Sequence, residues 1–375
     1  MKIKSVNAID VKGCYIAGGS VLSCVTKTEI ADYDVYPKTK EALLDTCIGL
    51  LDDGAFVVNI SDRAVTFKHN NVVSDNGERA IVQVMRFDEF TNPEKIFEFF
   101  DFTVCMGAYD CDDDTWHFQE DFWTDVAAKT LRFNPKTKYP LASLIRTTKY
   151  QKKGYYLNKG ESAKIGLAVA SHGLPTSWDE LESQIGGVYG KSIKVEVGEE
   201  EFSVERAYEI LSDLEYNVTY SDEEDFSWIN EDHLSIILDD AYKTLYKIGG
   251  GYYLVYEDSL VAISFDDRLE EYCNVMFADA SECPVKFITA YKHLKKQNDE
   301  YVGGVYCGDH NGVTYSDHEK TTYDKRPYLF SYKKKPTVKK GDYWAEVKIP
   351  IEDLVEAPYD KYVSKSIIVG EIKGD

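Results

Sequence analysis

Two groups of residues near the N-terminus have the types and spacing that phosphate and metal chemistry require. Gly18-Gly19-Ser20 is followed, twelve residues after the serine, by Asp32 and Asp34, two carboxylates with one residue between them. Backbone N–H groups at a glycine-rich helix start bind anions, and a serine hydroxyl adds a donor. Two carboxylates bind Mg²⁺ through oxygen, with phosphate oxygens completing its coordination. The alternative is a simple turn beside a solvated acidic strand edge, and these residues alone leave both interpretations open.

The element that must position the carboxylates is a strand. Residues 30–37, IADYDVYP, alternate apolar and polar positions. Side chains two apart in a strand point to the same face, so Asp32 and Asp34 are expected to lie together. The residues between the glycines and this strand suit one short helix, and 39–54 has a helical apolar stripe closed by a glycine.

A third carboxylate is expected from a later strand. Residues 55–69 and 80–87 are rich in Val, Ile and Phe and predict strands, and 92–100 predicts a short helix with proline in its first turn. Residues 101–110, DFTVCMGAYD, predict another strand that Asp101 begins. With a third carboxylate, a second Mg²⁺ can bind roughly 3.5–4 Å from the first. Asp101 could equally be an N-cap or strand-edge residue, with Asp88 or Asp110 as substitutes in the site.

The charge distribution shows one basic segment in an acidic chain of net charge −22. Residues 129–164 hold 10 Lys/Arg against a single Glu, whereas 1–128 have a net charge of −12 and 165–375 of −19. Helical spacing places Arg146, Lys149 and Lys153 on one face, and the apolar residues Leu141, Leu144 and Ile145 are expected to form the opposite, buried face. The basic face is either a solvated helix side or a positive wall for a triphosphate or an RNA backbone.

The order AGGS, DYDV and FDFTV resembles the nucleotidyltransferase superfamily that includes DNA polymerase β, poly(A) polymerases and CCA-adding enzymes. The resemblance covers roughly residues 10–175 and is greatest to the compact proteins of phages and bacteria that have a poly(A)-polymerase-like head. The chain lacks a counterpart of the motifs by which CCA-adding enzymes select CTP and ATP.

This resemblance implies a role for each candidate residue. Gly18, Gly19 and Ser20 would contact the nucleoside triphosphate, with Arg146, Lys149 and Lys153 as further nucleotide-binding residues. Asp32, Asp34 and Asp101 would be the catalytic residues and the ligands of a two-metal Mg²⁺ site. The expected fold is an α/β (α+β) nucleotidyltransferase head with a small mixed sheet over 1–124. A helical domain with the basic helix would follow over 125–190, and an acidic, Tyr-rich α+β domain of unknown role over 191–375.

The expected activity is metal-dependent transfer of a nucleoside monophosphate from an NTP such as ATP to an acceptor hydroxyl, with release of pyrophosphate. The basic helix favours an RNA acceptor, such as a tRNA 3′ end. The alternatives are a protein or small-molecule acceptor, as in toxin-type enzymes, and a non-catalytic module whose acidic C-terminal domain binds a basic protein partner. Scattered cysteines, the lack of an 18-residue apolar run and an N-terminus without a signal-like segment predict a cytoplasmic protein without a membrane partner.

Three other groups leave alternatives open. Cys307, His310 and His318 could begin a zinc site or form a turn. The acidic loop 110–114 could bind Ca²⁺, although a solvated hairpin tip fits its length better. The many tyrosines of the C-terminal part could stack on nucleic-acid bases or be half-buried strand residues.

Overall fold

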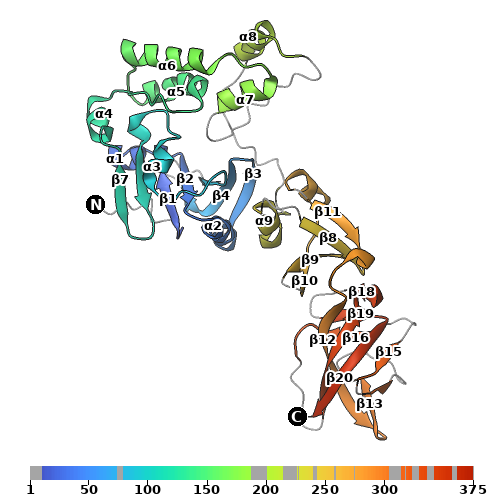
Figure 1. Ribbon diagram of the computed structural model, residues 1–375. Coiled ribbons are helices and arrows are strands. Elements are labelled where there is room, and N and C mark those ends of the chain that lie inside the picture. Colours follow the sequence, from blue (N-terminus) through green and yellow to red (C-terminus); the bar gives the residue numbers. More distant parts are fainter. Residues whose placement is uncertain are drawn as a thin grey trace. The chain divides into compact units, whose positions relative to one another are not determined.

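The chain divides into two compact units, residues 1–234 and 235–375 (Figure 1). The computed structural model describes residues 11–73, 79–186, 201–213, 226, 228–239, 243–256, 259–273, 275–303, 314–316, 318–322, 329–335, 342–356 and 361–374. The three domains expected from the sequence, 1–124, 125–190 and 191–375, stay a prediction.

Unit 1 is built around a mixed sheet of seven strands. The strands are β1 (Cys14–Ala17), β2 (Asp32–Pro37), β3 (Ala55–Ile60), β4 (Ala64–Val73), β5 (Arg79–Met85), β6 (Gly107–Asp110) and β7 (Thr115–Phe118). Their order is β3-β4-β5-β2-β1-β6-β7. The β2–β5 pair is parallel and the other neighbours are antiparallel. The mixed sheet and the strands expected at 30–37, 55–69 and 80–87 are therefore confirmed.

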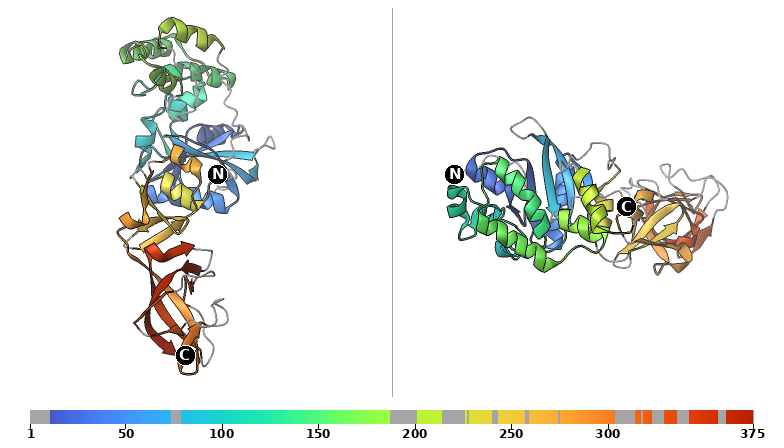
Figure 2. Two further views of the ribbon diagram at one scale, coloured as in Figure 1. Left: turned by 90° about the vertical axis from the view of Figure 1, so that its right-hand side faces the viewer. Right: turned by 90° about the horizontal axis from the view of Figure 1, so that it is seen from above.

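Helices cover both sides of this sheet. The helices described between residues 11 and 239 are α1 (Gly19–Thr26), α2 (Lys40–Asp52), α3 (Pro93–Phe97), α4 (Phe122–Ala128), α5 (Pro140–Lys152), α6 (Lys159–His172), α7 (Trp178–Gly186), α8 (Val204–Asp213) and α9 (Glu231–Ile237), of which α9 crosses the boundary between the two units. Local chemistry sets several starts: the Thr39 side chain accepts from the Ala42 N–H to cap α2, and Pro93 opens α3 after the Asn92 cap. Helix α2 lies against one side of the sheet, and α5 to α7 group together on the other (Figure 2).

The strand expected over 101–110 is wrong in its first half. Thr103–Cys105 form a 3₁₀ turn, and β6 begins only at Gly107. Every residue from 101 to 110 is buried, so the segment has no alternation that separates a strand from a buried turn. The turn is held from outside the segment, because the Thr103 hydroxyl donates to Asp125 at 2.5 Å and the Thr103 N–H donates to the Arg132 carbonyl.

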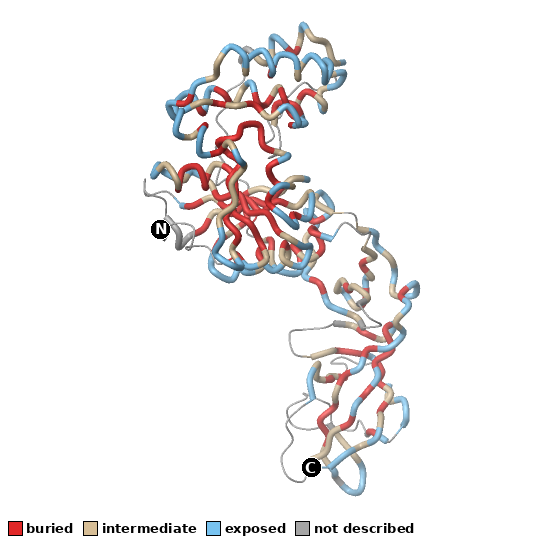
Figure 3. Tube along the Cα trace, turned by 60° about the vertical axis from the view of Figure 1, so that its left-hand side comes forward, coloured by how far each residue is buried: buried red, intermediate tan, exposed pale blue. Residues whose placement is uncertain are grey.

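An aromatic core fills the space between the sheet and the helical side of unit 1. The Tyr36 ring meets Phe90 and Phe100 edge to face, with ring centroids 5.0 and 6.0 Å apart. Phe102 meets Tyr150 of α5 in the same way at 5.5 Å. Burial is therefore concentrated in the strands and the turns above them, while the outer surface of α6 is exposed (Figure 3).

The described part of unit 2 consists mainly of strands. They are β8 (Lys243–Ile248), β9 (Gly251–Tyr256), β10 (Ser259–Ile263), β11 (Val275–Asp279), β12 (Phe287–Gln297), β13 (Glu300–Gly303), β14 (Thr314–Tyr315), β15 (Lys320–Thr322), β16 (Leu329–Tyr332), β17 (Tyr343–Pro350), β18 (Leu354–Glu356), β19 (Lys361–Ser364) and β20 (Ser366–Gly374). A four-stranded sheet has the order β10-β9-β8-β11, and the main path of a nine-stranded sheet is β15-β20-β17-β12-β16-β19-β18. Among the described residues of the whole chain, none of the helices has the length and apolar character that crossing a membrane requires.

Candidate active site

The pairing of β1 with β2 brings the glycine turn beside the carboxylates. Ala17, the last residue of β1, pairs with Asp34 of β2 in an antiparallel register. The chain then leaves the sheet through Gly18 and enters α1, while Asp32 lies two residues earlier on β2. The N-terminus of α1 and the two carboxylates therefore lie at the same end of the β1–β2 pair.

Glycine is required in this turn for its backbone conformation. Gly18 has φ of 80° and ψ of −133°, and its N–H donates to the Gly107 carbonyl at 3.1 Å. Residues with a side chain rarely adopt this conformation. A Cβ added at Gly19 would have no neighbouring heavy atom within 4 Å. The turn therefore exposes a bare backbone at Gly19, where a ligand can approach the first N–H groups of α1.

Ser20 is placed differently from the direct phosphate contact that the resemblance implies. The residue is 1% exposed, and its hydroxyl donates to the Ala17 carbonyl at 3.1 Å. The side chain thus closes the turn between β1 and α1. In this geometry Ser20 supports the cradle, and the backbone of Gly19 and Ser20 is the part available to a phosphate.

Asp32 and Asp34 differ in burial although they share a face of β2. Asp32 is partly exposed and Asp34 is 4% exposed. The parallel partner strand places Gln83 directly beside Asp34, and Gln83 is 1% exposed with its Nε2 3.5 Å from the Thr66 hydroxyl. Sequence reasoning missed Gln83, whose signal was a polar residue inside the apolar run AIVQVM.

Asp101 is buried and forms an ion pair with the basic helix. Its side chain is 5% exposed, and its Oδ2 lies 3.1 Å from Arg146 Nε. Burial raises the pKa of Asp101 above its usual value, while the Arg146 guanidinium, backbone N–H groups and Lys149 act in the opposite direction. Because Arg146 belongs to α5, this pair fastens the helix to the turn that precedes the 3₁₀ segment.

A short polar chain continues from Arg146 into the core. The Arg146 Nη2 donates to the Tyr150 hydroxyl at 3.2 Å, and that hydroxyl lies 2.6 Å from Cys105 Sγ. Burial raises the pKa of Cys105 to about 12 and also raises that of Tyr150. Both groups are therefore neutral at physiological pH, and their role in this arrangement is to position Arg146. Neither residue was singled out from the sequence.

The buried face of α5 differs from the expected one. Leu144, expected to be buried, is 49% exposed, and the residues buried on this helix include Ser143, Thr147 and Tyr150. These three residues are spaced four and three residues apart, so they lie on one face of the helix. The aromatic core and the Arg146 pair fix the rotation of the helix, and these tertiary contacts outweigh the leucine pattern. Leu141 and Ile145 instead pack partly buried against α7, with Leu181 and Ile185.

The C-terminal end of α5 brings positive charge toward the carboxylates. The pKa of Lys153 is lowered first by partial desolvation of its ammonium and then by Lys149, although the residue as a whole is exposed. The charges of Cys105 and Asp32 act in the opposite direction. Arg146 thus contacts Asp101, and the assignment of Arg146, Lys149 and Lys153 to nucleotide binding stays a prediction.

The donor set fits one Mg²⁺ more readily than two. Asp32 and Asp34 offer hard oxygen ligands on one strand face. Within the part of the chain that is described, no three His, Cys, Asp or Glu side chains are grouped to hold a metal ion. For Asp101 to act as a third ligand, its ion pair with Arg146 would have to open. Asp88, the first substitute, pairs with Lys95 at 2.7 Å.

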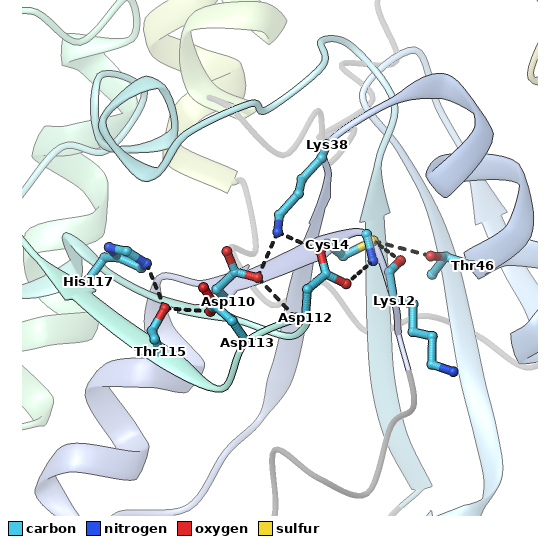
Figure 4. Close-up of polar contacts among 10 residues, drawn as sticks. Lys12, Cys14, Lys38, Thr46, Asp110, Asp112, Asp113, Thr115 and His117 are labelled. Carbon is cyan, nitrogen blue, oxygen red and sulfur yellow. Dashed lines mark hydrogen bonds and ion pairs between the residues drawn. The ribbon is translucent and has the colours of Figure 1, made fainter.

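The acidic loop is fastened to the sheet by a lysine (Figure 4). Lys38 Nζ donates to Asp110 Oδ1 at 2.7 Å and to Asp112 Oδ2 at 2.6 Å. The Gly13 N–H donates to Asp112 Oδ1 at 2.7 Å, and these bonds lower the pKa of Asp112. Asp110, the other substitute for Asp101, is therefore engaged at the far end of the β1–β6 pair. The loop is a hairpin tip in which Lys38 pairs with two of the four aspartates.

The cysteine–histidine group is only partly described. Cys307 and His310 lie outside the described residues, while His318 lies inside them with a positive φ of 60°. A zinc site in this segment stays a prediction.

The head therefore combines a mixed sheet, an open glycine turn, a D-x-D strand and an adjoining basic helix. Residues 1–129 of this chain match the model of a protein family described as Gad2, Gabija anti-defense 2 family protein. A curated relative, "Gabija anti-defense 2" of Bacillus phage SPbetaL7, is 29% identical over 218 residues, which are 57% of this chain and 52% of the relative. The chain thus spans about half the length of the curated relative that it matches.

Several solved structures of CCA-adding enzymes are similar over part of the chain. A CCA-adding enzyme in complex with ATP is 14% identical, with a TM-score of 0.37 over 63% of this chain and 58% of that one. The Thermotoga maritima CCA-adding enzyme in complex with tRNA is 13% identical, with a TM-score of 0.34 over 63% and 57%. A tRNA nucleotidyltransferase with a primer tRNA and an ATP analogue is 15% identical, with a TM-score of 0.34 over 60% and 63%.

Proposed function

We propose that unit 1 is a metal-dependent nucleotidyltransferase. It would move a nucleoside monophosphate from an NTP to an acceptor hydroxyl and release pyrophosphate. Asp32 and Asp34 would hold Mg²⁺, which when bound neutralises the triphosphate and its leaving pyrophosphate.

One observation carries this proposal: the register that pairs Ala17 with Asp34. It sets the open backbone of Gly19 and the N-terminus of α1 beside two carboxylates that share a strand face. A phosphate bound to the backbone N–H groups would thus lie next to the ligands of its counter-ion. A solvated strand edge, the alternative interpretation, does not explain why Asp34 is 4% exposed at this position.

The chain's own side chains divide the remaining work. Lys149 and Lys153 would bind the anionic triphosphate or the acceptor backbone. Arg146 is held by Asp101 and Tyr150, so we assign it mainly to positioning the basic helix. Asp101 is retained as a candidate third carboxylate, which the triphosphate could recruit by attracting Arg146 away.

The acceptor that this charge pattern favours is the 3′ end of an RNA, because residues 129–164 hold 10 Lys/Arg against a single Glu and an RNA backbone is a polyanion. A protein hydroxyl or a small molecule is the alternative acceptor. In a non-catalytic version, the same site would bind a nucleotide without transferring it.

The test is incubation of the full chain with Mg²⁺, each α-labelled NTP and either total RNA or total protein. Label in the RNA fraction supports an RNA acceptor, and label in the protein fraction or in a low-mass product assigns one of the other acceptors. The Asp32→Ala/Asp34→Ala variant must lose the label. Failure of every NTP to label any fraction contradicts the enzymatic proposal.

The similarity to Gabija anti-defense 2 supports a second, broader proposal: that the protein acts against a host defence system. It is tested by plating a Gabija-sensitive phage on cells that carry the defence system and express this chain. Restored plating supports the role. Comparison with Asp32→Ala/Asp34→Ala then distinguishes nucleotide transfer from a non-catalytic effect. If the variant still restores plating, nucleotide transfer is not the cause.

A further inference from the structure

The outer face of the nine-stranded sheet in unit 2 is distinct from its core face. On β12, Ile288, Ala290 and Leu294 are buried in the core, while the alternating residues Thr289 and Tyr291 point to the other face. The neighbouring strands β16, β19, β17 and β20 continue both faces (Figure 1). The outer face is therefore defined by register. Tyr291, Tyr332 and Trp344 are half-buried on it, and His293 is buried.

Three aromatic rings lie across adjacent strands on this outer face. Tyr291 of β12 pairs with Tyr332 of β16, so their side chains share the face. Trp344 of β17 pairs with His293 of β12, and its ring centroid is 6.3 Å from that of Tyr291. Neighbouring strands are about 4.8 Å apart, so the three rings form a row that successive unstacked bases can cover.

Lysine ammonium groups accompany these rings. Lys335 Nζ lies 4.0 Å and Lys373 Nζ 5.6 Å from the Trp344 ring centroid. Lys361 Nζ lies 5.4 Å from the centroid of Tyr332. We call Tyr291, Tyr332, Trp344, Lys335, Lys361 and Lys373 the aromatic–lysine face.

Three carboxylates accompany this face. Glu346 is exposed beside Tyr291, Glu371 Oε2 lies 3.5 Å from Lys373 Nζ, and Asp342 Oδ2 lies 3.0 Å from Nε2 of His293, the residue opposite Trp344. At the level of the sequence, residues 281–375 hold 16 Lys/Arg and 15 Asp/Glu, a net of +1, whereas 165–280 hold 6 and 26, a net of −20. Within the acidic C-terminal half of the chain, the segment that carries this face therefore repels an anionic ligand less than residues 165–280 do.

We propose that the aromatic–lysine face binds single-stranded nucleic acid. Bases would stack on Trp344, Tyr291 and Tyr332, and the lysines would leave the ring faces to contact phosphates. A duplex would bind less well, because its base faces are covered. The proposal concerns binding alone and does not depend on nucleotide transfer by unit 1.

The simpler interpretation is that lysine–ring pairs stabilise the solvent side of the sheet. That interpretation predicts no affinity for nucleic acid, so binding measurements distinguish the two.

The experiment uses the full chain without NTP and fluorescence anisotropy of labelled 12-nucleotide RNA, the same sequence as DNA, and the corresponding duplex. We expect the single strands to bind at least about tenfold more tightly than the duplex. Trp344→Leu should weaken binding about tenfold or more, whereas Trp344→Phe, which keeps a ring, should retain most of it. Equal binding of single strand and duplex, or no binding of any of the three, would overturn the proposal.

The charge contribution is measured separately. Lys361→Gln/Lys373→Gln should reduce the slope of log affinity against log salt by about 0.7 for each phosphate that a lysine no longer neutralises. The matched control is Lys247→Gln/Lys296→Gln, which removes the same charge elsewhere in unit 2 and should leave the slope unchanged. Equal loss of affinity in both pairs would show a non-specific charge effect and contradict the proposal. Because NTP is absent, no transfer by unit 1 can contribute to the binding measured, which keeps this test separate from the proposed transfer reaction.

Discussion

Replacing Arg146 with methionine isolates the contact that fastens the basic helix to the head. The Asp101 side chain is 5% exposed and that of Arg146 is 24% exposed. Removal of one partner from a buried ion pair costs roughly 3–5 kcal/mol, and the partial exposure of Arg146 places the expected loss near the lower end. Arg146→Met should therefore lower the free energy of unfolding of unit 1 by about 3 kcal/mol at pH 7.

The pH dependence gives this prediction a sign. Burial already raises the pKa of Asp101 from its usual 3.8, and loss of Arg146 should raise it further. A raised folded-state pKa means that a stability penalty is present above that pKa and is relieved as the pH falls through it toward 3.8. The difference between wild type and Arg146→Met should therefore shrink on acidification. Asp101→Asn in the Arg146→Met background should recover part of the loss at pH 7.

The assay must report unit 1 alone, because the chain has two compact units. Cys47 in unit 1 and Cys283 in unit 2 are both 0% exposed, so thiol labelling along a urea series, resolved by peptide mass, follows each unit separately. The control Lys95→Met breaks the half-exposed pair with Asp88, which should cost at most about 1 kcal/mol. Equal shifts of the Cys47 transition in Arg146→Met and Lys95→Met, or a loss that does not depend on pH, would refute the reasoning.

Three further predictions concern the glycine turn, a buried thiol and the hairpin tip. Gly18→Ala should lower the free energy of unfolding of unit 1 by about 1–3 kcal/mol in denaturant titrations, because alanine disfavours the positive φ. Gly19→Ala should change that free energy by less than about 1 kcal/mol, yet it should weaken NTP binding measured by calorimetry. Cys105, with a pKa raised to about 12, should resist iodoacetamide at pH 8 until the protein is unfolded, and rapid labelling of the native protein would contradict its placement. Lys38→Met should reduce stability slightly at pH 7. Since Lys38 lowers the folded-state pKa of Asp112, the wild-type advantage should begin to fall as the pH drops below 3.8 and be lost as the pH passes through the lower folded-state pKa. A difference that stays constant through this range would argue against the contact.

The part of the site that the sequence predicted depends on local geometry. Alternation within 30–37 was enough to place Asp32 and Asp34 on one face, since the period of a strand is fixed by its backbone. The glycine turn and the short helix after it are equally local. The spacing of charges at three and four along α5 predicts that Lys149 and Lys153 share a helix face with Arg146, and their role in the site stays a prediction.

The contacts that sequence reasoning missed depend on pairing between distant segments. Arg146 meets Asp101 only because α5 packs on the 3₁₀ turn, and a polar residue in an apolar run gave no sign that Gln83 lies beside Asp34 in a parallel pair. Leu144 shows the same limit, because its exposure follows from a helix rotation that tertiary contacts fix. The turn at 103–105 was taken for a strand because uniform burial removes the alternation that identifies one.

The identity of the transferred group tests the central claim most directly. We would incubate the full chain with Mg²⁺ and the acceptor fraction that gained label in the first test. The same NTP would carry ³²P at the α position in one reaction and at the γ position in the other. Nucleoside monophosphate transfer predicts that the acceptor gains the α label and never the γ label, that labelled pyrophosphate is released from the γ-labelled NTP, and that Asp34→Asn abolishes both signals. Gain of the γ label by the acceptor, or undiminished transfer by Asp34→Asn, would contradict the account.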